Sequence, residues 1–187
     1  MPLSKEHKAR TREKIVAAAG LLFRRAGYAE IGVDRIMAEA GLTRGGFYNH
    51  FPSKAALFAE VLGADHGLVR QLSAREGADR DTLRTQTRAI FRDYLAPAHL
   101  PEVALGCSFA ALANDAARAD DGARARFTEI YRRMVVEVDR ATADGPTAHA
   151  ALALAIGALS IARGLDDAGL RDSLLGAAAD AIDGLLA

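Results

Sequence analysis

Side chains suited to contacting nucleic acid are concentrated in one short stretch, residues 41–54, with the sequence GLTRGGFYNHFPSK. Arg44 can form two parallel hydrogen bonds to guanine, and Asn49 can do the same to adenine. Gly45 and Gly46 lie between them, although each glycine costs a helix about 1 kcal/mol relative to alanine. Two adjacent glycines in a short helix indicate a surface that something approaches closely, where backbone and Cα atoms at Gly46 can touch thymine methyl groups.

The residues around the glycine pair predict a helix of about two turns between two breaks. Thr43 is placed to cap its first N–H groups, Pro52 forces it to end, and Ser53 stands where the cap of a following helix belongs. Phe47 and Phe51 share the face opposite the glycines and Asn49. One face is therefore expected to enter the core, and the side-chain-poor face is expected to stay open.

A second short helix is predicted directly upstream, because apolar residues recur at i, i+3, i+4 and i+7. They are Val33, Ile36, Met37 and Ala40, and Gly41 can end the helix in a left-handed cap. Two short helices joined by a tight turn form a helix-turn-helix, whose second helix enters the major groove of DNA. An ordinary helical hairpin inside a bundle is the alternative, but it does not explain exposed glycines beside Tyr48 and His50.

With these elements, residues 8–62 resemble the DNA-binding domain of the TetR family of bacterial transcriptional regulators. The matching segments are 15–27 for the first helix, 33–41 for the second, and 42–57 for the recognition helix and the start of the next helix. The resemblance implies phosphate contacts from Thr43, Tyr48, His50 and Lys54. Gly32 lacks the hydroxyl that relatives usually carry there for a phosphate. Val33 and Gly45 complete the expected DNA-binding residues, and base reading falls to Arg44 and Asn49.

Composition and charge agree with a helical protein that meets a polyanion at one end. The 187 residues carry no net charge, but residues 1–60 hold 10 Lys and Arg against 6 Asp and Glu, and residues 61–187 hold 14 against 18. The basic end can orient an encounter with DNA, although solvated charge distributed by chance is the alternative. The single cysteine suits a reducing cytoplasm, and neither a signal peptide nor a membrane span is expected.

Hydrophobic periodicity predicts an all-α fold of about nine helices. The predicted ranges are 6–26, 33–40, 43–51, 53–75, 82–96, 102–118, 122–143, 147–164 and 170–186. We expect a helix-turn-helix domain at 1–52, a connecting helix at 53–76, and an effector-binding and dimerisation domain at 77–187. The apolar pattern of the connecting helix extends beyond the needs of the DNA-binding domain, so it is expected to link the two domains mechanically.

The last two predicted helices carry more small apolar surface than packing on one side requires. This favours a homodimer formed through a four-helix bundle, as the family resemblance also implies. The expected interface residues are Ala151, Leu152, Ala155, Ile156, Leu159, Leu174, Ala178 and Ile182. An internal packing face is the alternative. Two recognition helices one or more helical turns apart (~34 Å) would then read a palindromic operator.

The resemblance also implies a small-molecule effector whose binding moves the connecting helix and releases the DNA. The candidate lining is mostly apolar, which indicates a largely apolar effector. It consists of Phe91, Tyr94, Leu95, Cys107, Phe109, Leu112, Asn114, Phe127, Tyr131 and Met134. A stripe of aromatic residues at helical spacing is also typical of plain core. Arg80, Arg84, Arg88 and Arg92 either face an anionic ligand or form a solvated stripe paired with Asp81 and Asp93.

Other functions have weaker support in the sequence. The five histidines are scattered and form no metal-binding spacing with Cys107 or a carboxylate pair, so neither an enzyme nor a cofactor is expected. A DNA-binding regulator without an effector, or an activator, fits the same motif. Cys107 can act as a sensor of oxidants or electrophiles if its thiol is activated, but a buried cysteine is usually an inert apolar residue.

Overall fold

We obtained a computed structural model of the chain, which describes residues 5–64, 67–77, 79–97 and 107–187. Within these ranges the chain is helical and contains no strand. The elements are α1 (Lys5–Ala26), α2 (Val33–Glu39), the 3₁₀ helix η1 (Arg44–Asn49), α3 (Lys54–Ala64), α4 (Gly67–Ser73), α5 (Arg80–Tyr94), α6 (Ser108–Ala117), α7 (Asp121–Thr142), α8 (Gly145–Gly164) and α9 (Ala168–Leu185). The predicted fold class, a helix-turn-helix domain followed by a helical C-terminal domain, is confirmed.

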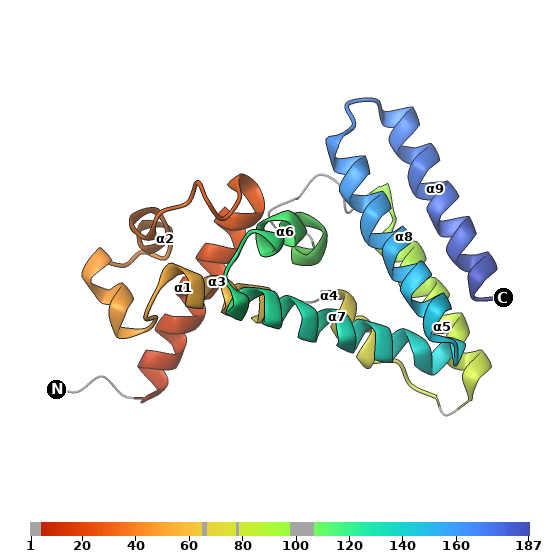
Figure 1. Ribbon diagram of the computed structural model, residues 1–187, viewed down its shortest axis with the longest axis horizontal. Coiled ribbons are helices and arrows are strands. Elements are labelled where there is room, and N and C mark those ends of the chain that lie inside the picture. Colours follow the sequence, from red (N-terminus) through yellow and green to blue (C-terminus); the bar gives the residue numbers. More distant parts are fainter. Residues whose placement is uncertain (1–4, 65–66, 78, 98–106) are drawn as a thin grey trace.

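The two domains lie at opposite ends of an elongated molecule (Figure 1). Helices α1 and α2 and the segment η1 form one end, α8 and α9 form the other, and α7 runs between them. Helix α3 packs on α1 and on α7, so it joins the N-terminal helices to the rest of the chain. The recognition segment is therefore carried at one tip of the molecule.

Two hydrophobic clusters account for the core. The N-terminal cluster gathers buried residues of α1, α2, η1 and α3, and it also takes in Leu112, Ala116 and Ala123 from α6 and α7. The C-terminal cluster is built from α4, α5 and α7 to α9, together with Phe109. The Phe127 side chain packs against both clusters. Helices α6 and α7 therefore connect the two cores physically.

Helix boundaries follow the predicted caps with two exceptions. Ser53 accepts a hydrogen bond from the Ala56 N–H at 3.0 Å, and Gly27 and Gly41 have positive φ angles at the ends of α1 and α2. Thr43, however, makes no side-chain capping bond to the described chain, and the recognition segment is a 3₁₀ rather than an α-helix. Two adjacent glycines weaken an α-helix, and a 3₁₀ helix is suited to so short a segment.

The predicted connecting helix, 53–75, corresponds to α3 and α4. Residues 65–66 between them lie outside the described ranges, so a continuous helix there stays a prediction. The predicted helix 102–118 is likewise described only from Ser108 onward. The side chain of Asp79 begins α5 by accepting from the Thr82 N–H at 2.8 Å. Helix α5 is therefore held at its start by a side-chain cap.

The predicted dimer-interface residues lie mostly inside a single chain. Ala151, Leu152, Ala155, Leu159, Ala178 and Ile182 are buried in the C-terminal cluster, and Ile156 and Leu174 pack against it. The fully buried members of this set have a core role, because α8 is apolar on more than one side. Leu174 and Ala178 also line a groove on the outer side of α8 and α9, and an interface there stays a prediction. The exposed large apolar residues of these two helices are Leu154, Ile161, Leu170 and Leu185.

Helix α8 is long and apolar enough to cross a membrane when judged by length and composition alone. It packs on α7 and on α9, and its buried face from Ala148 to Ala162 belongs to the C-terminal cluster. A core helix of a folded domain meets the same length and composition criteria. This packing explains the apolar character of α8 without a lipid environment.

Candidate nucleic-acid interface

The recognition segment η1 is amphipathic, with an aromatic inner side and an outer side poor in side chains. Phe47 and Phe51 are fully buried, with ring centroids 5.8 Å apart. On the outer side a Cβ atom added at Gly45 would meet no atom of the described chain within 4 Å. Tyr48 is 65% exposed, and its ring meets Phe47 edge-on at 5.2 Å. Bare backbone is therefore presented outward from a rigid aromatic base.

Gly46 has a second role in holding η1 close to α2. A Cβ atom at this position would lie 3.5 Å from Cε of Met37, which is itself buried. The small residue thus allows the two short helices to pack closely. Val33, at the start of α2, is half-buried and packs against the N-terminal cluster. It contributes to the core of the motif, which the sequence pattern alone also indicated.

Arg44 is exposed but is not free. Its Nη1 lies 2.9 Å from Oδ2 of Asp34 on α2, and both side chains are well exposed to solvent. An exposed ion pair of this kind is worth only about 0–1 kcal/mol, so the guanidinium can leave it for a stronger partner. The sequence did not single out Asp34 as a partner of Arg44, because the two residues are ten positions apart and belong to different helices.

Arg12 connects three elements beneath the recognition segment. Its guanidinium donates to the Glu60 carboxylate, at 2.9 Å from Nε, and also to the carbonyl of His50. The same group lies 4.0 Å from the centroid of the Phe51 ring. Arg12 therefore fixes the end of η1 against α1 and α3.

Lys54 makes contacts within the chain that the sequence did not predict. Its ammonium donates to the carbonyls of Tyr28 and Ile31 at 2.9 and 3.0 Å, and it lies over the Tyr28 ring at 4.2 Å. Two of its three donors thus close the loop between α1 and α2. Lys54 therefore has a structural role, because the loop brings carbonyl acceptors within its reach, and the phosphate contact expected from its remaining donor stays a prediction.

His50 follows η1 and is half-buried. Burial, together with the positive charges of Lys8, Arg12 and His7, lowers the pKa of its imidazole. Its Nδ1 is buried and makes no hydrogen bond to the described residues. A neutral ring is thus favoured near neutral pH, and it can approach a phosphate only as a neutral donor through Nε2.

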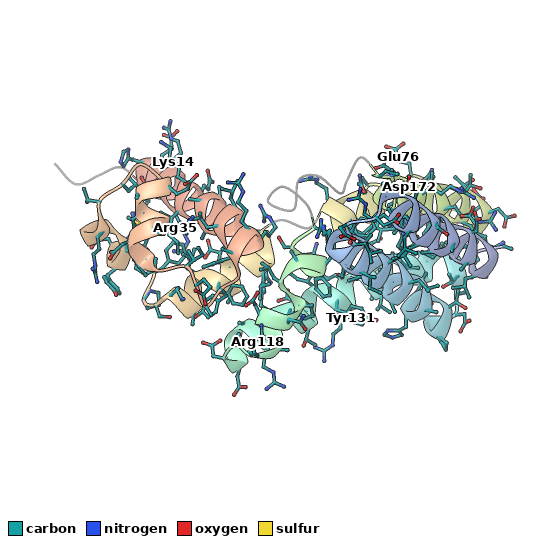
Figure 2. All side chains as sticks on the ribbon, turned by 90° about the horizontal axis from the view of Figure 1, so that it is seen from above. Lys14, Arg35, Glu76, Arg118, Tyr131 and Asp172 are labelled. Atoms are coloured by element: carbon teal, nitrogen blue, oxygen red, sulfur yellow. The ribbon has the colours of Figure 1, made fainter. Side chains whose placement is uncertain are left out.

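The outer surface that remains consists of Arg44, Gly45, Tyr48 and Asn49, all exposed, with Thr43 beside them. Figure 2 shows Lys14 and Arg35 on the same N-terminal part of the molecule, far from Glu76 and Asp172 on the C-terminal part. Gly32 caps α2 with no side-chain contact, as expected from its lack of a hydroxyl. The site thus combines polar and cationic side chains around bare backbone, which suits phosphate and base-edge contacts.

The effector-lining candidates separate into three groups. Phe91, Tyr94, Leu95, Phe109 and Met134 are buried in the C-terminal cluster, and Cys107, Phe127 and Tyr131 pack against it. The Phe109 and Phe127 rings are stacked at 3.8 Å. Leu112 instead belongs to the N-terminal cluster, and Asn114 is exposed. Leu112 lies on the side of α6 that packs toward the N-terminal helices, whereas Asn114, two residues further along, faces solvent.

The arginines of α5 are engaged with carboxylates from two helices. Arg84 lies 3.4 Å from Asp81, as expected, but Arg92 pairs with Asp183 and Asp180 of α9 rather than with Asp93. Arg88 donates to the Asp183 carbonyl at 3.2 Å. The stripe therefore helps to join α5 to α9.

Comparisons with known proteins agree with this geometry. A model of the family "Bacterial regulatory proteins, tetR family" matches residues 15–61. The HTH-type transcriptional regulator YfiR of Bacillus subtilis is 34% identical over 68 residues, which are 35% of this chain and 33% of YfiR. The HTH-type transcriptional repressor Rv1474c of Mycobacterium tuberculosis is 32% identical over 75 residues, 40% of each chain. The chain thus matches about a third of the length of these curated relatives.

Similarity of structure extends much further along the chain. A crystal structure of a TetR transcriptional regulator from Chloroflexus aurantiacus superposes with a TM-score of 0.74 at 26% identity. The match covers 95% of this chain and 96% of that one. The N-terminal helices are therefore shared in sequence and fold, and the C-terminal helices are shared in fold.

Proposed function

We propose that this chain, which belongs to the TetR family of bacterial transcriptional regulators, is a cytoplasmic DNA-binding repressor rather than an enzyme. The observation that carries the proposal is the exposed outer side of η1, where bare glycine backbone stands between Arg44 and Tyr48. A duplex can approach this surface without displacing side chains. The name of the mycobacterial relative supports repression as the direction of control.

In this proposal η1 enters the major groove and the surrounding residues divide two roles. Tyr48, Thr43 and His50 contact phosphates, which position the protein without reading sequence. Arg44 leaves Asp34 to bind guanine, and Asn49 binds adenine. The aromatic base of Phe47 and Phe51, together with the Arg12 contacts, keeps the reading surface in a fixed orientation.

We further propose that the chain acts as a homodimer through the outer side of α8 and α9. A groove of about 370 Å³ lies there, and its lining includes Leu154, Gly157, Ile161, Leu174 and Ala177. Ile161 is 57% exposed in the single chain. Covering this apolar surface with a second copy would place two η1 segments on one palindromic operator, with successive major grooves about 34 Å apart.

A small-molecule effector completes the proposed cycle. The expected domains at 1–52 and 77–187 would be coupled through residues 53–76, and the packing of α3 on both α1 and α7 supports this coupling. A ligand among α5 to α8 would shift this connection and change the separation of the two η1 segments. A regulator without an effector is the alternative, and a thermal-shift screen for stabilising compounds distinguishes the two.

Selection of binding sites from a random DNA pool tests the DNA-binding proposal. Tyr48→Ala should weaken binding to every sequence alike, whereas Arg44→Ala should relax one base pair by about 1–3 kcal/mol. Affinity should also fall steeply with salt. Arg132 is an exposed arginine on α7, so Arg132→Ala is the matched control. It should change neither the affinity for DNA nor the base preference.

Two results would oppose the proposal in different ways. Unchanged base preferences in Arg44→Ala would show that this residue does not read sequence. A protein without salt-sensitive affinity for any duplex would refute DNA binding itself.

A further inference from the structure

A buried cation lies near the end of α8 without a partner in the part of the chain that the structure describes. All three guanidinium nitrogens of Arg163 are buried, and none of them makes a hydrogen bond to that part of the chain. The preceding residue, Ala162, is fully buried in the C-terminal cluster. An arginine carries its charge at any physiological pH, and a buried charge is costly unless it is paired. An anion bound beside Arg163 would pair with this charge.

Tyr94 of α5 presents a second polar group to the same region. Its side chain is 6% exposed, and its buried phenol oxygen has no partner at ordinary hydrogen-bond geometry among the described residues. The Cys107 side chain is nevertheless close enough to interact with this oxygen. Burial raises the pKa of Tyr94 well above its ordinary value, the Cys107 side chain adds to this rise, and the charge of Arg163 opposes it. Both of these residues therefore lie within electrostatic range of the Tyr94 oxygen.

The packing of α6 against α8 gives independent support to this arrangement. Ser160 donates from Oγ to the carbonyl of Ala110 at 3.0 Å. Arg163 is one turn beyond Ser160 on α8, and Cys107 is one turn before Ala110 on α6. The first N–H groups of a helix have no partner within it, and Cys107 supplies no side-chain cap to α6. The start of α6 thus adds a partial positive charge near Tyr94.

We propose that Arg163 and Tyr94, beside the start of α6, bind the carboxylate of a largely apolar ligand. The guanidinium fork matches a carboxylate in geometry, and the Tyr94 hydroxyl can donate to the same group. This inference rests on the proposed function, because it assigns a chemical class to the effector. It adds a carboxylate to the expected largely apolar effector, since Arg163 was absent from the predicted lining.

The surroundings favour a carboxylate on an apolar body over a small inorganic anion. Phe91 and Phe109 are buried in the same cluster as Tyr94, and Phe127 stacks on Phe109 at 3.8 Å. These aromatic side chains make the surroundings of Tyr94 apolar, which suits the hydrocarbon part of a ligand. One guanidinium and one hydroxyl match a single negative charge better than the multiple charges of phosphate.

Thermal-shift and calorimetric titrations of the full chain test the proposal. The probes are benzoate and octanoate, each compared with its neutral amide, and inorganic phosphate. The wild-type protein should bind at least one carboxylate about ten- to a hundredfold more tightly than its amide. Arg163→Met should abolish that preference, and Tyr94→Phe should reduce it. The exposed-arginine variant Arg132→Met should retain it.

Ligand-free stability separates a binding role of Arg163 from a structural one. Methionine fills a similar volume without a charge, so Arg163→Met should leave the ligand-free Tm unchanged or raise it. A lower Tm would show that the arginine stabilises the fold, and it would overturn the proposal. Equal binding of both carboxylates and their amides, or a preference for phosphate over both carboxylates, would also overturn it.

DNA binding measured on the same samples distinguishes this inference from the proposed function. Salt-sensitive affinity for a selected duplex without any carboxylate preference would overturn the ligand assignment alone. A carboxylate preference that depends on Arg163, in a protein without DNA affinity, would refute the proposed function and leave the anion site in place.

Discussion

Replacing Arg75 by methionine should destabilise the chain without unfolding it. Arg75 follows α4, and its side chain is 1% exposed. Its guanidinium donates to the Leu72 carbonyl at 2.7 Å, to the Thr87 hydroxyl of α5, and to the Glu137 carbonyl of α7. It also lies 3.5 Å from the Glu137 carboxylate. One side chain thus ties three helices together at the C-terminal side of the connecting segment.

The loss in the free energy of unfolding depends on which hydrogen bonds each partner of Arg75 keeps in the variant. The Glu137 carboxylate keeps its hydrogen bonds from Arg140 at 2.8 Å and from Ser73 at 3.1 Å, so its charge still has partners. The Thr87 hydroxyl still donates to the Leu83 carbonyl at 2.6 Å. The main loss is one donor for each of two carbonyls, at about 1–1.5 kcal/mol apiece. We therefore expect a loss of about 2–3 kcal/mol, below the ~3–5 kcal/mol of a stranded buried charge.

Urea and thermal unfolding monitored by circular dichroism measure this loss. In a chain of this size, 1 kcal/mol corresponds to about 2–4 °C in Tm, so Arg75→Met should lower Tm by roughly 4–12 °C. Arg84→Met removes only the partly exposed pair with Asp81 and should cost at most about 1 kcal/mol. A loss for Arg75→Met no larger than that of the control would refute the reasoning, because it would mean that the guanidinium contacts contribute nothing.

Three further predictions concern the DNA-binding end and the dimer. The lowered pKa of His50 means that the folded state binds fewer protons than the unfolded state, so stability should fall below pH ~6.5. His50→Gln should flatten this dependence in urea titrations, and identical pH profiles would contradict the shift. Asp34→Asn frees Arg44 from its ion pair and should raise DNA affinity by up to about fivefold in anisotropy titrations, whereas a lower affinity would mean that Asp34 orients Arg44 for binding. Ile161→Asp should yield monomers in sedimentation experiments while Val136→Asp, similarly exposed on α7, should not, and a dimeric Ile161→Asp would place the interface elsewhere.

Local patterns predicted the helices because each depends on residues three or four apart. The apolar repeat of α1 and the positive-φ glycines Gly27 and Gly41 correspond to observed boundaries. Phe47 and Phe51 are buried and Gly45 is open, as the pattern indicated, whereas Gly46 packs against Met37. The resemblance to a regulator family also came from this contiguous stretch, the same region that the family model matches.

Long-range contacts decided the roles of the basic side chains. Arg12 and Glu60 are 48 residues apart, and Lys54 reaches carbonyls 23 and 26 residues away. A long, flexible cation in a basic segment fits a phosphate contact and an internal clamp equally well on sequence alone. The choice depends on which acceptors the fold brings within reach.

The sequence by itself determined an all-α chain with an open, glycine-containing recognition segment, because helical period and glycine conformation are local properties. Only the tertiary structure decided which apolar side of α8 faces inward, since Ala151 and Ile161 both fit an apolar helix. It alone also showed Arg163 buried near Tyr94 with no partner among the described residues. The burial and pairing of a side chain depend on residues from helices that are distant in sequence, so the local hydrophobic period does not predict them.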